Sequence, residues 1–447
     1  MLGTRYVIVM KIEVVNISIM RIGNGEETIM LDTDTMRPVI PASGITGAFR
    51  NYLSFAESDN RYIDMLFGKK EGKSRLFVQD AVCKDVFDGT LELRERVCIN
   101  PRTATGSAEK FNTKMLGAGW KFDIFFTAEA ENEEEKEVFR ELLKKAVRAL
   151  DIADVRLGAQ KTNGAGKFEV KSVWEGIVDL FDPKQYWLYL SNSIKMQNIT
   201  KQVRRKVISE TKVCLKTETQ AVTPLLVAGK SMEDGQDTTK IFYRNRKGEY
   251  VIPGSSLKGI LRMQCQKIAE YMRLDRELTD MMFGIKGAAG QSGCIFVSDS
   301  TVHVERGKKH KESTYYGIGI DKFTAGVRTG ANFSSKPVKA RFDLDISVQR
   351  MRDQKRDAAV GLLLFALRDI LQERVPLGAY GGKGFGRLSA KNISVFDGSV
   401  FDIRLDTPLT DGERERQEQS VKKYMKALKA YRGGKSDAEV HTGFSEQ

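Results

Sequence analysis

The feature that most constrains the fold is that this chain of 447 residues repeats itself once. Five short motifs occur in the same order in both halves, and their copies are displaced by 212, 216, 219, 221 and 220 residues. The first copies lie at 39–47, 64–68, 76–80, 99–104 and 157–167, and the second at 251–259, 280–284, 295–299, 320–325 and 377–387. Short turns resemble one another by chance, but five motifs rarely keep one order by accident. We therefore predict two copies of one kind of domain, which a chain of this length can accommodate.

Each half is predicted to contain the same succession of secondary-structure elements. An alternating strand opens the half, a helix follows a Pro-containing turn, and a short strand precedes a long polar excursion. A second helix, a glycine-rich loop and a closing strand complete it. The main predicted elements cover 6–20, 44–55, 132–150 and 167–173 in the first half and 206–219, 256–272, 357–373 and 387–396 in the second. This βαββαβ-like order predicts an α+β fold of two tandem ferredoxin-like (RRM-like) domains, each with a long insertion.

The domain boundaries follow from the positions of these motifs. We place the two domains at 1–180 and 205–400, with a linker at 181–204 between them. The remaining residues, 401–447, form a charged C-terminal tail in which one helix is expected at 413–431.

The composition narrows the class of partner. Lys and Arg number 72 and Asp and Glu 59, so the formal net charge is +13. This excess favours nucleic acid, because each neutralised phosphate releases counterions, although a basic protein without such a partner is the alternative. Five scattered cysteines and three histidines argue against zinc sites and favour a cytoplasmic location. No membrane partner is expected, since no apolar run is long enough to cross a bilayer.

The turn at Pro253 and the helix that follows it form the first candidate binding element. The free amides of a helix N-terminus attract phosphate, and basic residues four apart share one face of a helix. The candidate RNA-binding residues of this element are Ser255, Ser256, Lys258 and Arg262 in the second half and Ser43 and Arg50 in the first. Thr46 replaces the lysine in the first half, so weaker phosphate binding is expected there. The alternative is that the serines cap the helix and the basic residues are solvated.

The glycine-rich loop at 378–387 forms the second candidate element. It matches neither nucleotide-binding glycine motif, but glycines let backbone amides approach phosphates closely. Tyr380 or Phe385 can stack a base. The candidate RNA-binding residues of these loops are Gly381, Gly382, Lys383 and Arg387, with Lys161 and Lys167 in the first half. A tight turn between a helix and a strand is the alternative.

Together these motifs resemble a known family. The segments 252–259, 282–284, 320–325 and 378–386 look like those of the RAMP-superfamily backbone subunit of type III CRISPR effector complexes, here as a tandem two-domain fusion. The resemblance covers nearly all of the second half, and the first half carries a weaker copy. It implies a ferredoxin-like palm, a thumb-like hairpin formed by the insertion, and copies that line up along a guide RNA. It also implies that each thumb kinks the duplex of guide and target RNA, and that other effector subunits are partners.

The insertion supplies further candidate residues. In the second half a basic stretch from His303 to Lys311 is followed by 320–328. The candidate RNA-binding residues of the insertions are Lys322 and Arg328, with Arg102 in the first half. Basic hairpins suit a nucleic-acid groove, and apolar residues at their tips can wedge between bases. A solvated charged loop is the alternative.

The resemblance also implies a catalytic aspartate in the loop before the Pro-containing turn, about fifteen residues upstream of the proline. Asp237 lies sixteen residues before Pro253, with Asp234 close by, and the same count in the first half reaches Glu26. The expected residue would bind a divalent ion, Mg²⁺ or Mn²⁺, or orient the attacking 2′-hydroxyl during cleavage of the target RNA. We expect Asp237 to be the metal ligand and the second domain to be the more active endoribonuclease. A solvated acidic loop is the alternative.

Two other functions of the same fold stay open. A non-catalytic scaffold would bind guide RNA without using its acidic loops. A guide-processing endoribonuclease would use His303 or His310 as a metal-independent acid or base. A metabolic enzyme is disfavoured, because the sequence has no catalytic-triad pattern, dinucleotide fingerprint or cysteine cluster.

Overall fold

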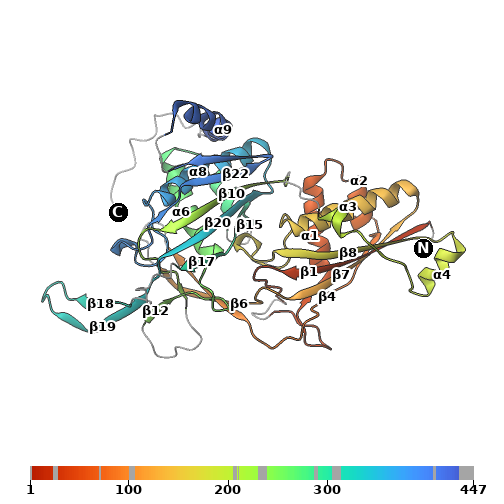
Figure 1. The fold of residues 1–447 in the computed structure, drawn as a ribbon, viewed down its shortest axis with the longest axis horizontal. Helices are drawn as coiled ribbons and strands as arrows, with labels where there is room; N and C mark the ends of the chain where they lie inside the picture. Colours follow the sequence, from red (N-terminus) through yellow and green to blue (C-terminus); the bar gives the residue numbers. More distant parts are fainter. Residues whose placement is uncertain are drawn as a thin grey trace. The chain divides into compact units, whose positions relative to one another are not determined.

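The computed structural model describes residues 3–23, 29–69, 72–99, 106–204, 209, 211–229, 239–285, 290–304, 314–405 and 409–431. The chain forms two compact units, each of which contains helices and strands (Figure 1). The first unit comprises Met1–Asn100 and Thr105–Thr211, with the short segment Asn245–Gly248, and the second comprises Lys212–Arg244 and Glu249–Gln447. The predicted α+β class is confirmed.

The first unit is built on an antiparallel sheet with the strand order β3-β7-β1-β8-β9. The strands are β1 (Tyr6–Asn16), β3 (Leu76–Val78), β7 (Lys121–Ala130), β8 (Phe168–Asp179) and β9 (Gln197–Asn198). Alternate residues of β1 and β7 are buried, because successive side chains of a strand point to opposite faces. β1 ends at Asn16 and not at the predicted Met20. The buried Asn16 side chain accepts hydrogen bonds from the amides of Gly119 and Trp120, so it holds a loop and does not extend the sheet.

The helices of the first unit pack on one face of this sheet (Figure 1). The main helices are α1 (Ala42–Ala56), α2 (Arg61–Phe67) and α3 (Glu133–Asp151). Phe49 of α1 and Phe139 of α3 are fully buried together with Phe126 of β7. α3 begins where Asn132 accepts a hydrogen bond from the amide of Glu135, and the acidic residues of its first turn suit the positive end of a helix dipole. The predicted order of strand, helix, strand, strand, helix and strand is therefore present.

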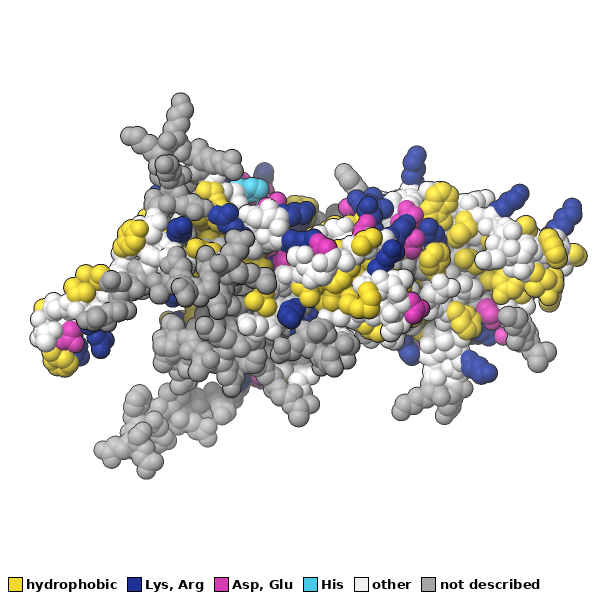
Figure 2. All heavy atoms as spheres, turned by 90° about the horizontal axis from the view of Figure 1, so that it is seen from below, with side chains coloured by type: hydrophobic (Ala, Val, Ile, Leu, Met, Phe, Trp, Pro, Cys, Tyr) yellow, Lys and Arg dark blue, Asp and Glu magenta, His cyan; other side chains and the backbone are white. Residues whose placement is uncertain are grey.

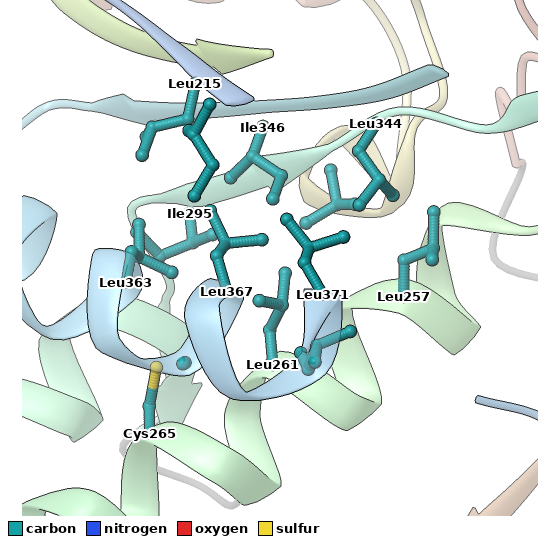
Figure 3. Packing of buried hydrophobic residues seen from close by; sticks show 14 of the residues in the cluster. Leu215, Leu257, Leu261, Cys265, Ile295, Leu344, Ile346, Leu363, Leu367 and Leu371 are labelled. Carbon is teal, nitrogen blue, oxygen red and sulfur yellow. The ribbon is translucent and has the colours of Figure 1, made fainter. Parts of the chain in front are cut away.

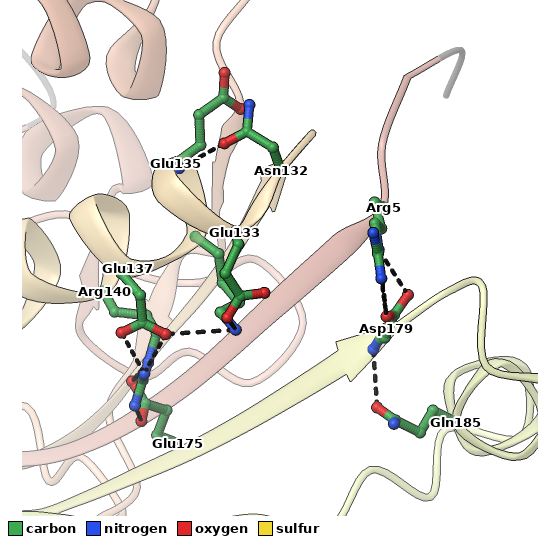
Figure 4. A network of polar contacts seen from close by, with 10 residues as sticks. Arg5, Asn132, Glu133, Glu135, Glu137, Arg140, Glu175, Asp179 and Gln185 are labelled. Carbon is green, nitrogen blue, oxygen red and sulfur yellow. Dashed lines mark hydrogen bonds and ion pairs between the residues drawn. The ribbon is translucent and has the colours of Figure 1, made fainter.

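Polar contacts tie α3 and the start of β1 to β8 (Figure 4). The Arg140 guanidinium lies 2.7 Å from the buried carboxylate of Glu175 and 2.7 Å from that of Glu137. The hydrogen bonds that Arg140 donates to Glu175 are the main reason that the pKa of Arg140 is raised. At the end of the strand, Arg5 pairs with Asp179 at 3.0 Å. Because an unpaired buried charge is costly, Arg140 fixes the position of α3 over β8.

The second unit repeats this plan with additional edge strands. Its sheet has the order β13-β17-β20-β10-β22-β23, while β16 pairs with β20 and β21 pairs with β10. The strands are β10 (Lys212–Ala221), β13 (Val251–Ile252), β16 (Ile295–Val297), β17 (Ser300–Val304), β20 (Ala340–Gln349), β21 (Leu388–Ser389), β22 (Asn392–Asp397) and β23 (Ser399–Arg404). The predicted closing strand at 387–396 is thus interrupted between β21 and β22.

The main helices of the second unit are α6 (Gly254–Tyr271), α7 (Arg276–Phe283) and α8 (Asp353–Leu371). Figure 3 shows side chains of α6 and α8 directed toward those of the sheet. Leu257 and Leu261 of α6 and Leu367 of α8 lie against Leu344 and Ile346 of β20. α8 is buried over most of its surface, which the long apolar run in its sequence indicates.

The repeat extends to the backbone. α2 and α7 both end at a glycine with nearly the same dihedral angles, φ 83° and ψ 159° at Gly68 and φ 85° and ψ 160° at Gly284. In each unit the polar excursion is a β-hairpin, formed by β5 (Glu92–Ile99) with β6 (Gly106–Met115) and by β18 (Tyr315–Ile320) with β19 (Val327–Lys336). β19 starts 221 residues after the start of β6 and ends 221 residues after its end. In both hairpins the strand pairing shifts its register next to an isoleucine, Ile99 or Ile320. The hairpin of the second unit projects from its sheet (Figure 1).

Smaller elements complete the two units. The second hairpin continues into a four-stranded sheet through β12 (Thr239–Phe242), which is parallel to β19, and β11 (Ala228–Gly229). The remaining short elements are β2 (Val39–Ile40), β4 (Ala81–Val82), β14 (Gly284–Ile285), β15 (Gln291–Ser292), η1 (Lys161–Asn163) and η2 (Gly381–Lys383). Within the described ranges, every helix is too short or too polar to cross a bilayer.

The segment between the two repeats is ordered. It contains α4 (Pro183–Leu190), β9 and α5 (Thr200–Val203). Val203 is buried in the core of the first unit, and Arg148 of α3 donates a hydrogen bond to its carbonyl oxygen. In the C-terminal region the predicted helix is confirmed as α9 (Asp411–Lys429).

A buried carboxylate holds α9 in place. The Tyr424 hydroxyl donates a hydrogen bond of 2.7 Å to Asp397, at the turn between β22 and β23, and Lys423 pairs with the same carboxylate. Burial alone would raise the pKa of Asp397, but the hydrogen bonds from Lys423 and Tyr424 outweigh it and hold the pKa below its usual range. A carboxyl with a depressed pKa stabilises the folded state above its unfolded pKa of about 3.9, and this contribution is lost as the pH falls through the folded pKa.

We expect Asp397→Asn to weaken the docking of α9 by about 1–3 kcal/mol at neutral pH, because the charged hydrogen-bond acceptor is lost. Amide hydrogen exchange in 423–429 should be faster in the variant at pH 7, and its difference from the unmodified protein should narrow below about pH 4. Asp402→Asn, at an exposed carboxylate on β23, is the matched control. Equal exchange rates of α9 in all three proteins at neutral pH would contradict this role for Asp397.

Candidate nucleic-acid interface

The N-termini of α1 and α6 are already bound by carboxylates of the protein. The amide of Gly254 donates a hydrogen bond of 2.7 Å to Asp299, and in the first unit the amide of Ala42 donates one of 2.7 Å to Asp80. In each unit, therefore, one backbone amide at the start of the helix, where phosphate binding was predicted, is already hydrogen-bonded to an aspartate of the protein. Sequence analysis placed Asp80 and Asp299 in the third repeated motif but missed this role, because it depends on how the short strands β3 and β16 approach the helices.

The basic residues of these helices also have internal contacts. Arg262 donates a hydrogen bond of 3.2 Å to the carbonyl oxygen of Gly284 at the end of α7. Arg50, its counterpart, pairs with Asp64 of α2 at 3.4 Å. Both arginines thus join the first two helices of their unit. Lys258 is half-buried, as are Ser255 and Ser256, while Ser43 is exposed.

The two glycine-rich loops have nearly identical backbones. Gln160 and Tyr380, at equivalent positions, are left-handed with φ 61° and 62°. Gly386 has φ 76°, and a Cβ atom on it would lie 2.0 Å from the carbonyl oxygen of Leu377. The chain itself requires glycine at this position. Gly382 differs, because a Cβ atom on it would meet nothing within 4 Å.

The charged residues of the loops are more exposed in the second unit. Gly382, Lys383 and Arg387 are exposed, and Gly381 is half-buried. The Arg387 guanidinium donates a hydrogen bond of 2.8 Å to the carbonyl oxygen of Glu373. In the first unit Lys161 and Lys167 are only half-exposed, and the Lys161 carbonyl accepts a hydrogen bond of 2.8 Å from Arg156.

An aromatic cluster joins the glycine-rich loop of the second unit to the base of its hairpin. The ring centroid of Phe385 lies 5.3 Å from that of Tyr315 on β18 and 5.9 Å from that of Tyr380, and both pairs are edge-to-face. The ammonium groups of Lys240 and Lys383 lie 5.1 Å and 4.9 Å from the Tyr380 ring centroid. Lys240 belongs to β12, so the hairpin, the glycine-rich loop and β12 come together in this unit. Sequence analysis missed Tyr315 and Lys240, although the alternation in 315–320 was a signal for the former.

The hairpin presents an aromatic residue at its tip. The Asp321 carboxylate accepts hydrogen bonds of 3.0 Å from the amides of Phe323 and Thr324, and these lower the pKa of Asp321. Such an Asx turn fixes the local backbone. The Phe323 side chain is 87% exposed, with the ammonium group of Lys322 5.5 Å from its ring centroid. Arg328 is exposed on the returning strand. Figure 2 shows apolar and basic side chains together on a projecting part of the molecule.

Several predicted site residues lie outside the described residues. They are the acidic candidates Asp237, Asp234 and Glu26 and the basic residue Arg102, with most of the basic stretch that ends at Lys311. Among the residues that the structure describes, no group of three or more His, Cys, Asp or Glu side chains is placed to hold a metal ion.

The comparison with protein families agrees with the duplicated geometry. The family model of the RAMP superfamily matches residues 13–169 and 219–389. The chain belongs to the RAMP superfamily. Each matched segment of this RAMP protein runs from the last residues of the first strand through the hairpin to the glycine-rich loop. No curated protein matches the sequence significantly. Membership implies a CRISPR-associated protein that binds RNA, in a superfamily that includes ribonucleases.

Proposed function

We propose that this RAMP protein is the backbone subunit of a type III CRISPR effector complex, in which it holds guide RNA and cleaves the paired target RNA. The observation that carries the proposal is the edge-to-face contact of Tyr315 with Phe385, which joins the hairpin to the glycine-rich loop. β12, the strand that follows the acidic loop, pairs with β19 of the same hairpin, so all three elements lie together. An RNA strand bound there would contact all three elements. Its other partners would be the remaining subunits of the complex.

The arrangement of the sheets supports an RNA-binding palm. In the first unit the closing, first, third and second strands of the predicted plan lie in the order β8-β1-β7-β3. In the second unit the corresponding order is β22-β10-β20-β16. We assign both units to the ferredoxin-like plan on this basis. Helices cover one face, as they do in RNA-binding domains that present a sheet and loops to single strands.

The hairpin supports the assignment of a thumb. Phe323 is held at the tip by the turn at Asp321 and is almost fully exposed, so an apolar ring is presented to a ligand at little conformational cost. Lys322 and Arg328 beside it are suited to phosphates. A wedge of this kind can separate stacked bases and distort a duplex.

The acidic loop supports cleavage in the second unit. Glu233, Asp234 and Asp237 lie in the nine residues between β11 and β12, and carboxylate oxygens are the ligands that Mg²⁺ and Mn²⁺ prefer. The donor set therefore fits a divalent ion, with Asp237 as the principal ligand. Such an ion would stabilise negative charge at the scissile phosphate. The chain itself would contribute by holding the guide RNA, and with it the paired target strand, against the thumb and the glycine-rich loop.

The proposal is tested by the RNA that the full chain carries. After expression beside a CRISPR array and purification at low salt, the bound RNA should be enriched in guide sequences. For single-stranded RNA, the logarithm of the association constant should fall with the logarithm of salt by about 0.7 per phosphate contacted. A protein that is purified without RNA, and that binds guide RNA no better at low salt than at high salt, would overturn the proposal.

A further inference from the structure

The short helix α4, in the segment between the two repeats, turns an apolar face to solvent. Four of its residues follow the spacing i, i+3, i+4 and i+7 that places side chains on one face of a helix, and all four are exposed: Pro183, Tyr186, Trp187 and Leu190. The three large ones, with Phe181 just before the helix, are between 45% and 73% exposed. A surface helix normally turns such a face toward the core, so α4 has the amphipathic pattern in the reverse orientation.

Polar contacts, and not apolar burial, hold α4 in place. The Asp182 carboxylate accepts a hydrogen bond of 2.9 Å from the amide of Lys184 at the start of the helix. The Gln185 side chain donates a hydrogen bond of 2.9 Å to the same carboxylate, and it accepts one of 2.9 Å from the amide of Asp179 at the end of β8 (Figure 4). These contacts stabilise a helix that is too short to be stable alone. None of the eight residues of α4, all of which the structure describes, is buried, so the apolar face is not part of the core.

The chain on both sides of α4, which lies at the margin of the first unit, is also fixed (Figure 1). Before the helix, the Arg5 guanidinium pairs with Asp179 and lies 5.5 Å from the ring centroid of Phe181. After the helix, the chain returns along β8, where Gly176 leaves room for Ile194. A Cβ atom at residue 176 would lie only 2.7 Å from Cγ2 of Ile194. Because a face that is already ordered loses little entropy on binding, this one is suited to be a binding surface.

The segment that carries this face, 181–195, presents positive charge to a partner. Its charged residues are Asp182, Lys184 and Lys195. Both lysines are exposed, whereas Asp182 is half-buried and its carboxylate caps the helix. The neighbouring Asp179 is likewise engaged, because it pairs with Arg5 at 3.0 Å. A complementary surface would therefore be apolar at its centre and would carry carboxylates at its rim.

The size and charge of the face decide among its possible occupants. Since an aromatic side chain buries about 150–250 Å², the exposed residues of the face offer roughly 500 Å². A stable complex takes about 800 Å² from each partner, so the face is too small to hold two copies of this chain together. A symmetric contact would also bring the same positive charges together. A strand of RNA needs a positively charged groove, and Lys184 is the only charged residue of α4. A helix with anchors at this spacing fits an apolar groove of another protein.

We propose that α4 is a docking helix for another protein, in which Trp187 and Leu190 insert into an apolar groove and carboxylates at the rim of the groove pair with Lys184. Trp187 is the principal anchor, because tryptophan is enriched among the residues that dominate binding energy. The proposal goes beyond the proposed function and does not depend on it. α4 lies between the two segments, 13–169 and 219–389, that match the RAMP superfamily.

The test uses the full chain in its source cells, with the photo-reactive residue benzoylphenylalanine in place of Trp187. Irradiation should cross-link one protein, and mass spectrometry of the joined peptides should map the contact to an apolar groove bordered by Asp or Glu. With that protein in purified form, Trp187→Ala should raise the dissociation constant roughly 30-fold or more, as expected for a dominant anchor. Lys184→Glu should lower the association rate, most strongly at low salt. Tyr271→Ala removes a tyrosine that is 91% exposed on α6 and should change neither quantity.

Other results would overturn the docking helix. They are the absence of a protein cross-link at position 187, a cross-link to RNA or to a second copy of this chain, and binding to anionic phospholipid vesicles that Trp187→Ala abolishes. The free energy of unfolding of Trp187→Ala should stay within about 0.5 kcal/mol of that of the unmodified chain. A clearly larger loss would show that the face packs within the fold. The affinity for guide RNA should be unchanged, so a chain that binds its protein partner but no RNA would refute only the proposed function.

Discussion

Replacing Asp237 with alanine is expected to reduce cleavage of the target RNA by roughly 100- to 10,000-fold, the range that a positioned acid–base group or metal ligand contributes. Binding of guide RNA should be unchanged, because the glycine-rich loop and the thumb provide the contacts with the strand. The measurement is single-turnover cleavage of a labelled target by the full chain loaded with guide RNA, with Mg²⁺ or Mn²⁺ and with a chelator. Glu270→Ala, at an exposed carboxylate of α6, is the control.

The same experiment separates the alternative functions. Cleavage at the original rate in Asp237→Ala would show that this residue is not catalytic, and Asp234→Ala and Glu26→Ala would then show whether another acidic residue is responsible. An absence of cleavage in the unmodified, guide-loaded protein would favour a scaffold. Cleavage that continues in the presence of a chelator would favour a metal-independent mechanism, for which His303 on β17 is a candidate.

Replacing Gly386 with alanine is expected to destabilise the second unit by at least about 3 kcal/mol. A left-handed conformation costs a residue with a side chain roughly 1–2 kcal/mol, and the new methyl group would also lie 2.0 Å from the carbonyl oxygen of Leu377. The loop must move to relieve this contact. Weakened RNA binding should accompany the loss of stability, since Lys383 and Phe385 are held by the same loop.

Neighbouring glycines provide a matched series. Gly384 has φ 86° but open space around its Cβ position, so Gly384→Ala measures the backbone cost alone, roughly 1–2 kcal/mol. Gly382→Ala has neither cost and should change stability by less than about 1 kcal/mol. If Gly386→Ala is no more destabilising than Gly384→Ala, the contact with Leu377 does not constrain the loop.

The distribution of tryptophan makes this measurement specific. All three tryptophans, Trp120, Trp174 and Trp187, belong to the first unit. Denaturant unfolding followed by tryptophan fluorescence should therefore be unchanged by the Gly386 variant, while circular dichroism should show an earlier transition for the second unit. Gly166→Ala, with its Cβ position 2.1 Å from the carbonyl oxygen of Leu157, should shift the fluorescence transition instead.

Much of the architecture follows from patterns that are local in the sequence. The alternation in β1, the apolar run of α8 and the repeated motifs were sufficient to predict two α+β copies with their elements in the observed order. The ends of the elements were less predictable. β1 stops four residues early because buried Asn16 binds a loop that is about one hundred residues away in the chain.

The sequence by itself determined the duplication, the α+β class, the order of the elements and the positions of the hairpins and glycine-rich loops, since these depend on periodicity and on motifs a few residues long. Only the tertiary structure decided which side chains meet. It placed Asp299 at the start of α6, turned Arg262 toward Gly284, and brought Tyr315 against Phe385. The physical reason is that such contacts are set by the pairing and register of strands distant in the chain, and no local pattern records that pairing.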